Sequence, residues 1–233
     1  MQKKIDLLHG NLYSVLLWFA LPFLAANLIQ VLYGTVDLLV VGWYNGEAQI
    51  SAVSLGSQIT QLLLSLITGL TMGSTVLIAQ YAGNGKEKDI ESSIATTFTL
   101  FLFLGVMLTV VMLVLTPQLL QLIQTPPEAY GDACSYVYIC SIGIIFSFGY
   151  NAVSAVLRGL GDAKSPLYFI ITACIVNVVL DFLLVAGFHM GAAGAAIATT
   201  FSQGVSLILA IMFLRKQNFS FDFHLSSFHL HKG

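Results

Sequence analysis

The sequence predicts an all-α integral membrane protein, a bundle of six transmembrane helices. Hydrophobic residues make up 57% of the 233 residues and charged residues only 9%. Six apolar runs are long enough to cross a bilayer, and the nine lysines and arginines all fall on one side of the resulting topology. A soluble domain of this size would need many more charges to cover its surface. With a net charge of −2, the chain also lacks the concentrated basic face that nucleic-acid binding requires.

The apolar runs define six spans and two terminal segments. A transmembrane helix needs about 20 apolar residues. We expect spans at 14–42, 51–82, 93–116, 132–157, 166–188 and 192–214, with Gly, Pro and charged residues in the connections. Residues 1–13 are then an amino-terminal cytoplasmic segment, 14–214 the six-helix lobe and 215–233 a cytoplasmic linker.

Lysine and arginine placement sets the expected orientation, because these residues concentrate in cytoplasmic loops. In the predicted topology all nine lie outside the spans, at the two ends of the chain or in the second and fourth connections. They are Lys3, Lys4, Lys86, Lys88, Arg158, Lys164, Arg215, Lys216 and Lys232. We therefore expect a multi-pass protein of the cytoplasmic membrane with both termini in the cytoplasm.

Polar residues inside the predicted spans indicate a functional site, since an ionised side chain at the membrane centre costs about 2.5 to 3.5 kcal/mol on insertion scales. Residues three or four apart share one face of a helix. Such stripes occur at Asn27, Gln30, Gly34 and Asp37, at Gln58, Gln61, Ser65, Thr68 and Thr75, and at Thr199, Ser202, Gln203 and Ser206. Asn177 and Asp181 lie one turn apart in the fifth span. Because these faces are unsuited to lipid, we expect them to line a shared interior or a hydrated cleft.

Four of these residues are expected at one depth. A rise of about 1.5 Å per residue places Asp37, Asp181 and Thr199 about 9 to 12 Å from the outer ends of their helices, with Asn177 one turn deeper. Their oxygen atoms suit a hard cation or a shared proton better than a soft transition metal, and two neighbouring carboxyls titrate as a unit. The four residues are therefore predicted to bind a coupling ion. The alternative is that they only form hydrogen bonds within the bundle.

Several motifs, in this order, resemble the amino-terminal lobe of the MATE (multidrug and toxic compound extrusion) transporters. They are Leu21-Pro22 and Asp37, GLTMGSTVLIAQYAG at 69–83, LRGLGDAKSP at 157–166, NVVLD at 177–181 and GAAGAAIAT at 191–199. The resemblance covers all six spans and implies one lobe of a twelve-helix antiporter that exports organic cations or other amphipathic compounds. It implies coupling to Na⁺ or H⁺ at Asp37, Asn177, Asp181 and Thr199, and no cofactor. Pro22 is expected to kink the first helix by removing a backbone hydrogen bond.

The expected binding partners follow from the cleft and from the helix count. Candidate residues for the substrate cleft are Asn27, Gln30, Gln58, Gln61 and Tyr136, and apart from Na⁺ at the coupling site no metal is expected. The expected partners are membrane lipids, a small amphipathic or cationic substrate, and a second lobe or a second copy. With six of the family's twelve helices, the chain is expected to be a truncated gene product or a fragment. A half-transporter that dimerises is the alternative.

Other function classes make different demands on the residues. A flippase of the same superfamily, moving a lipid-linked oligosaccharide, would need cationic side chains in the cleft for phosphate groups, and no lysine or arginine falls within the predicted spans. A truncated fragment would not transport. An intramembrane enzyme is not expected, because no His-Glu metal motif or Ser/His arrangement occurs at membrane depth.

Overall fold

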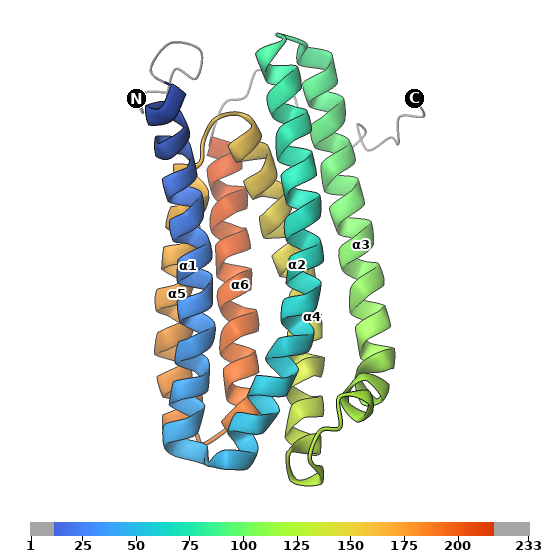
Figure 1. Cartoon of the computed structure of the whole chain (residues 1–233), viewed down its shortest axis with the longest axis vertical. Coiled ribbons are helices and arrows are strands. Elements are labelled where there is room, and N and C mark those ends of the chain that lie inside the picture. Colours follow the sequence, from blue (N-terminus) through green and yellow to red (C-terminus); the bar gives the residue numbers. More distant parts are fainter. Residues whose placement is uncertain (1–11, 217–233) are drawn as a thin grey trace.

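The computed structural model describes residues 12–216, which form six long helices with short turns between them (Figure 1). The elements are α1 (Leu12–Asn45), α2 (Glu47–Gly83), α3 (Glu87–Leu122), α4 (Pro127–Gly159), α5 (Lys164–Asp181), a short π-helix η1 (Phe182–Gly187) and α6 (Gly191–Lys216). All six long helices are apolar enough to cross a membrane. The predicted fold class is therefore confirmed. Of the predicted terminal segments, residues 1–11 and 217–233 lie outside the described residues.

The helices extend past the apolar runs that predicted them. The largest difference is α3, which was expected at 93–116 and runs from Glu87 to Leu122. Its first turn carries Glu87 and Asp89, and acidic residues there interact favourably with the helix dipole. Hydrophobicity reports the part of a helix inside the hydrocarbon, whereas polar residues can continue the same helix into the interface.

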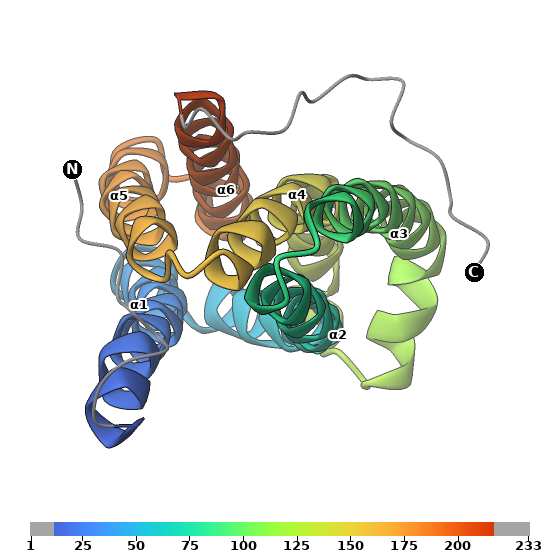
Figure 2. The ribbon, with the colours of Figure 1, turned by 90° about the horizontal axis from the view of Figure 1, so that it is seen from above.

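Helix α4 lies at the centre of the bundle. It packs against α2, α3 and α6, and it is the most buried of the six spans. Figure 2 shows α4 between these three helices, with α1 and α5 side by side at one edge. Helix α1 also touches η1, α2 and α6. The arrangement therefore brings α1, α5 and α6, which carry the predicted ion site, into mutual contact.

Small residues allow the helices around α4 to approach closely. The last residue of α4, Gly159, faces α2, and a Cβ atom there would lie 2.8 Å from the Cβ of Ile78 and 3.0 Å from the Thr75 carbonyl oxygen. Gly105 of α3 makes room for Phe148, whose ring packs edge-on against Phe101 with 5.8 Å between centroids. Small residues at interfaces are typical of membrane helices, where close packing replaces the hydrophobic effect.

The described lysines and arginines gather at one end of the bundle. Figure 1 shows at this end the start of α1, the turns α2–α3 and α4–α5, and the end of α6. These segments carry Lys86, Lys88, Arg158, Lys164, Arg215 and Lys216. The opposite end, formed by the other three connections, has no lysine or arginine among the described residues.

The contact at Gly159 predicts a specific loss of stability. Gly159→Ala should lower the free energy of unfolding by about 1 to 3 kcal/mol, because the methyl group overpacks a backbone oxygen and a Cβ that cannot rotate away. The measurement is a denaturant titration in detergent micelles followed by circular dichroism.

Gly131→Ala is the matched control on the same helix, since a Cβ there would have nothing within 4 Å. It should be neutral or stabilising by up to about 1 kcal/mol, the helix propensity of alanine over glycine. Equal effects of the two substitutions would contradict the close α2–α4 contact.

Candidate functional site

The first part of the site joins α1 to α6. The hydroxyl of Thr199 donates a 2.8 Å hydrogen bond to Asp37 Oδ2. Both residues are buried, with exposed fractions of 8% and 3%. Asp37 occurs where the polar stripe of α1 meets α6, because Asn27, Gln30, Gly34 and Asp37 follow one helix face. The structure therefore places these two predicted site residues in direct contact.

The second part of the site lies on α5, behind Asp37. Asn177 and Asp181 lie one turn apart and both have an exposed fraction of 0%. The side chains of Asn177 and Asp181 are close enough to Asp37 to interact with it. All four residues of the predicted ion site thus form one cluster between α1, α5 and α6.

Several polar atoms of this cluster lack hydrogen-bond partners among the described residues. Asp37 Oδ1, both carboxylate oxygens of Asp181 and both polar atoms of the Asn177 amide have none among the described residues. Ionised carboxylates only accept hydrogen bonds, so the contact between Asp37 and Asp181 has no donor unless a proton sits on one of them. A monovalent hard cation could use the same oxygens. This group of oxygen atoms therefore fits either a shared proton or a bound Na⁺.

The helix geometry changes directly after Asp181. Residues 182–187 form the π-helix η1, which packs against α1, α5 and α6. Single π-helical turns inside α-helices often occur at functional sites. The hydrophobic pattern of the fifth span had predicted one uniform helix to residue 188, because a π-turn leaves no mark on hydrophobicity. The wider turn therefore borders the acidic cluster without any sequence signal for it.

A cavity of about 430 Å³ opens beside the cluster. Asp37 and Thr199 form part of its wall, whereas Asn177 and Asp181 are not among its lining residues. Of the predicted cleft residues, those that line it are Asn27, Gln30, Gln61 and Tyr136. Gln58 is exposed and is not among the described residues that line this cavity, and its place in the substrate cleft stays a prediction. Its neighbours Ser57 and Thr60 line the cavity instead, because the face of α2 that meets the cavity is rotated slightly from the predicted stripe.

Tyrosines around Asp37 were not predicted as a group. Tyr33 and Tyr136 line the cavity, interact electrostatically with Asp37 and with each other, and Tyr33 also interacts with Gln203 of α6. Cys140 of α4 lines the same wall. Tyr33 could have been found from the sequence, since it is four residues from Asp37 and therefore on the same helix face.

A second cavity of about 380 Å³ lies toward the cationic end of the bundle. It shares with the first cavity Asn27, Gln30, Thr68, Tyr150, Asn151 and Ile170, so the two are continuous. Its wall also includes Arg158. The sequence placed Arg158 in the connection after the fourth span, so a cation in this wall was not expected. The predicted span ended at residue 157, whereas α4 continues to Gly159 and turns Arg158 toward this inner pocket.

Pro22 lies inside α1, which continues without a break on both sides of it. The side chain of Pro22 is buried. Proline cannot donate the backbone hydrogen bond to the carbonyl four residues earlier, which here belongs to Trp18. The helix is therefore weakened at this point, about 22 Å from Asp37 along the axis.

A polar contact at the opposite end from the lysines and arginines ties three helices together. Gln49 of α2 donates to Asp132 Oδ2 of α4, and its Oε1 accepts a 2.7 Å hydrogen bond from the backbone N–H of Ala192 in α6. Gly191 precedes this contact with φ of +55°, and a Cβ atom there would lie 2.5 Å from Gln49 Oε1. The contact holds the ends of α2, α4 and α6 together and was not predicted.

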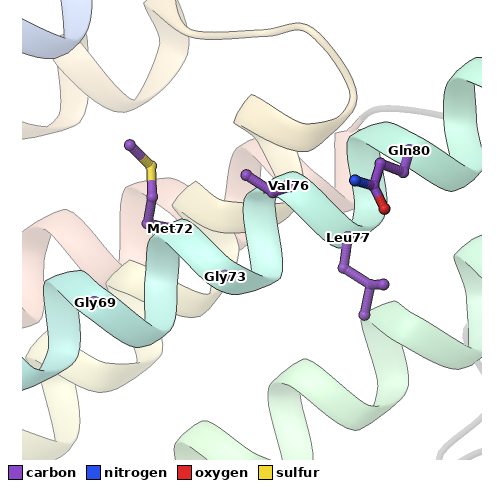
Figure 3. A pocket seen from close by; sticks show the side chains of 6 residues that line it. All are labelled: Gly69, Met72, Gly73, Val76, Leu77 and Gln80. Atoms are coloured by element: carbon purple, nitrogen blue, oxygen red, sulfur yellow. The ribbon is translucent and has the colours of Figure 1, made fainter.

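A shallow groove marks the exposed face of α2. It has a volume of about 460 Å³ and is lined by Gly69, Met72, Gly73, Val76, Leu77 and Gln80. Figure 3 shows these side chains projecting from one helix around the two glycines. The groove shares Gly69 and Met72 with the inner pocket, but contains no ionisable group.

Known proteins are similar to this chain in both sequence and fold. The model of the MatE family matches residues 22–183. The chain is 35% identical over 214 residues to "Probable multidrug resistance protein YpnP" of Bacillus subtilis (strain 168), covering 92% of this chain and 48% of that protein. It is 32% identical over 213 residues to "Probable multidrug resistance protein NorM" of Thermotoga maritima, covering 87% and 45%. The chain therefore spans about half the length of the curated relatives it matches.

A solved structure shows the same relationship in three dimensions. A crystal structure of MATE in the bent conformation superposes with a TM-score of 0.92 at 25% identity, covering 100% of this chain and 52% of that one. The family match includes Asp37 on α1 and the Asn177/Asp181 pair on α5. The six-helix bundle thus corresponds to one lobe of a larger transporter fold, and this chain belongs to the MatE (multidrug and toxic compound extrusion) family of membrane transporters.

Proposed function

We propose that this chain forms one lobe of an antiporter that exports organic cations and related amphipathic compounds across the cytoplasmic membrane, driven by Na⁺ or H⁺. The observation that carries the proposal is the pair Asp37 and Asp181, buried within membrane-spanning helices, with Asp37 at the wall of the cavity. The names of the relatives, which describe multidrug resistance, support export of drugs.

Burial of this pair supports coupling because an uncompensated charge in a membrane interior is unfavourable. A proton or Na⁺ that enters between the carboxyls removes part of that charge. An ion shifts a conformational equilibrium only by its different affinity for the two states. Asp37 touches the cavity whereas Asp181 is enclosed, so the ion would reach the pair through Asp37.

Helix α1 is the proposed moving part. It carries Asp37, and it contains Pro22, where the backbone hydrogen-bond ladder is interrupted. Loading of the ion would change the interaction of Asp37 with α5 and α6, and α1 would bend or straighten at Pro22 in response.

The available driving force is adequate for export. One elementary charge that crosses a potential of 100 mV releases about 2.3 kcal/mol. Since 1.4 kcal/mol corresponds to a factor of ten, this supports a substrate gradient of nearly fiftyfold.

The cavity beside Asp37, called the outer cavity from here on, is lined by groups that favour a cationic substrate. Among the described residues that line it, Asp37 is the only charged one. Tyr33, Tyr136 and Tyr150 also contribute to the wall, and aromatic rings attract organic cations. A lipid-linked oligosaccharide flippase, the alternative function, would need several cationic side chains for phosphate groups. Among the described residues that line the two connected cavities, Arg158 is the only lysine or arginine, which favours the exporter.

A second lobe or a second copy is proposed to close the cleft. Gln30, Gln61, Ser65 and Thr68 line the cavity and are nevertheless exposed on the lobe. Such side chains are unfavourable against lipid, so they need water or protein on their open side. The groove around Gly69 and Gly73 offers a face on which another membrane helix could pack closely.

The orientation can be tested by cysteine labelling. Single cysteines at Glu47 and Glu128, at the end of the bundle without lysine or arginine, should react with an impermeant maleimide in intact cells. A cysteine at Lys86 should react only after permeabilisation. The background for all three is a chain with Cys134, Cys140 and Cys174 replaced by serine. Labelling of Lys86→Cys in intact cells would overturn the orientation.

The coupling site can be tested by removing one carboxylate at a time. Asp37→Asn should abolish ion-driven efflux, so that the nearly fiftyfold gradient expected at 100 mV falls to the ratio measured without a driving force. Asparagine keeps an oxygen that can accept the hydrogen bond from Thr199, so the protein should still fold and insert. Asp181→Asn should behave in the same way. The measurement is efflux of a fluorescent cation from vesicles containing the complete gene product, under imposed Na⁺ or pH gradients.

Asp162→Asn is the control for these two substitutions. Asp162 accepts hydrogen bonds from the backbone N–H groups of Lys164 and Ser165 at 3.1 and 3.0 Å and so shapes the turn before α5. Its replacement should change stability but leave the Na⁺ or pH dependence of efflux unchanged. The coupling proposal fails if Asp37→Asn and Asp181→Asn both transport normally with unchanged ion dependence.

A further inference from the structure

Arg158 lies in an unusual position for a cation in this bundle. The other described lysines and arginines are exposed, whereas Arg158 is half-buried and forms part of the wall of the inner pocket. Its guanidinium carbon lies 5.0 Å from the ring centroid of Phe23 on α1. On the other side it interacts with the side chain of Tyr150. The cation is therefore held between α1 and α4 rather than extended into water.

The contacts of Arg158 leave most of its binding capacity unused. A guanidinium carries five N–H donors, and a cation–π contact uses none of them. The Tyr150 hydroxyl donates to the Pro166 carbonyl at 3.0 Å, so it can offer Arg158 only its lone pairs. Among the described residues, Arg158 has no carboxylate partner. Among the described residues that line the inner pocket there is no aspartate or glutamate.

The rest of the inner pocket is suited to an anion. Amide side chains of Asn27, Gln30 and Asn151 contribute to its wall, and each amide nitrogen carries two donor hydrogens. Asn27 and Asn151 each use one of these in a bond to a carbonyl of their own helix, which leaves one free. The pocket thus combines a cation with amide donors and no competing acid.

The inner pocket is separate from the acidic cluster. Phe23, which contacts Arg158, and Asp37 are both on α1, and about 21 Å of helix rise lies between them. The charged groups of a small drug cannot span that distance. The continuous cleft therefore has an acidic outer end and a basic inner end.

A purely structural role would explain the charge but not its placement. A cation in the last turn of a helix interacts favourably with the helix dipole, and Arg215 and Lys216 occupy the same position in α6. Both of these side chains are exposed, so the dipole does not require a cation to be placed against a cavity. Arg215 is therefore the matched control for Arg158.

We propose that the inner pocket is an oxyanion-binding subsite, in which Arg158, assisted by Asn27 and Asn151, binds the carboxylate or phosphate group of an amphipathic molecule. The guanidinium fork matches both groups, because it can donate two parallel hydrogen bonds to two oxygens. The inference rests on the proposed role of the cleft as a substrate path. It extends the substrate class to amphipathic molecules that carry an anionic group.

The test is a binding titration without any ion gradient. The 233-residue chain in nonionic detergent is titrated with dansyl-undecanoic acid and, separately, with its uncharged methyl ester, at mildly alkaline pH. Fluorescence enhancement gives the two dissociation constants. Their ratio reports recognition of the anionic group and does not depend on the fraction of folded protein. The variants are Arg158→Gln, Arg158→Lys and the control Arg215→Gln.

We expect the native chain to bind the acid about tenfold or more tightly than the ester, the factor typical of a charge-assisted hydrogen bond. Arg158→Gln should bring the ratio close to one, and Arg158→Lys should give an intermediate value because it keeps the charge but loses the fork. Arg215→Gln should keep the native ratio. The proposal is overturned if the native chain binds the acid and the ester equally. It is also overturned if Arg158→Lys and Arg158→Gln both fold and keep the acid-to-ester ratio of the native chain.

The source of the anion is distinguished in nanodiscs. If phosphatidylglycerol mixed into phosphatidylcholine competes with the acid, the pocket binds a lipid headgroup phosphate; if it does not, the pocket binds a free amphipathic acid. Both results keep the oxyanion subsite. Since binding is measured at equilibrium, a failure of the Asp37/Asp181 coupling proposal would leave these ratios unchanged, and the two proposals fail independently.

Discussion

Two carboxylates buried between membrane-spanning helices are the constraint on which the rest of this structure depends. Asp37 and Asp181 cannot face lipid, and among the described residues neither has a cationic partner. Helices α1, α5 and α6 must therefore meet around them, with Thr199 supplying the one hydrogen bond that the pair receives. At the same end of the bundle Gln49 fastens α2, α4 and α6 to one another. Closure at that end leaves the cavity beside Asp37 as the open side of the cluster.

The packing divides the lobe into a tightly packed part and a less constrained one. Helix α4 is enclosed by α2, α3 and α6, with contacts as close as those at Gly105 and Gly159. Helix α1 is much less buried than α4 and contains a proline. Tightly packed interfaces resist small shifts, so a rearrangement driven at Asp37 meets less resistance along α1 than within the α4 core.

Charge is distributed unevenly along the cleft. The acidic group Asp37 and three tyrosines line the outer cavity, whereas Arg158 and amide side chains line the inner pocket. Asn27 and Gln30 belong to both and connect them. Low polarity between helices strengthens electrostatic interactions, so the opposite charges of Asp37 and Arg158 give the two ends of the cleft different ligand preferences. An open flank of exposed polar side chains on α1 and α2 is what a partner lobe would have to cover.

The sequence by itself determined the six helices, the gathering of Lys and Arg at one end and the face of each helix that carries polar groups, because hydrophobic length, charge and the 3.6-residue period are local properties. The similar membrane depths estimated for Asp37, Asn177, Asp181 and Thr199 also predicted from the sequence that these four residues form one site. Only the tertiary structure decided how each face is rotated toward its neighbours. That rotation encloses Asp181 while Asp37 reaches the cavity, leaves Gln58 off the wall, and turns Arg158 inward from the end of α4. The tertiary structure also contains the π-helix η1 directly after Asp181. These features depend on contacts between residues far apart in the chain, which periodicity cannot report.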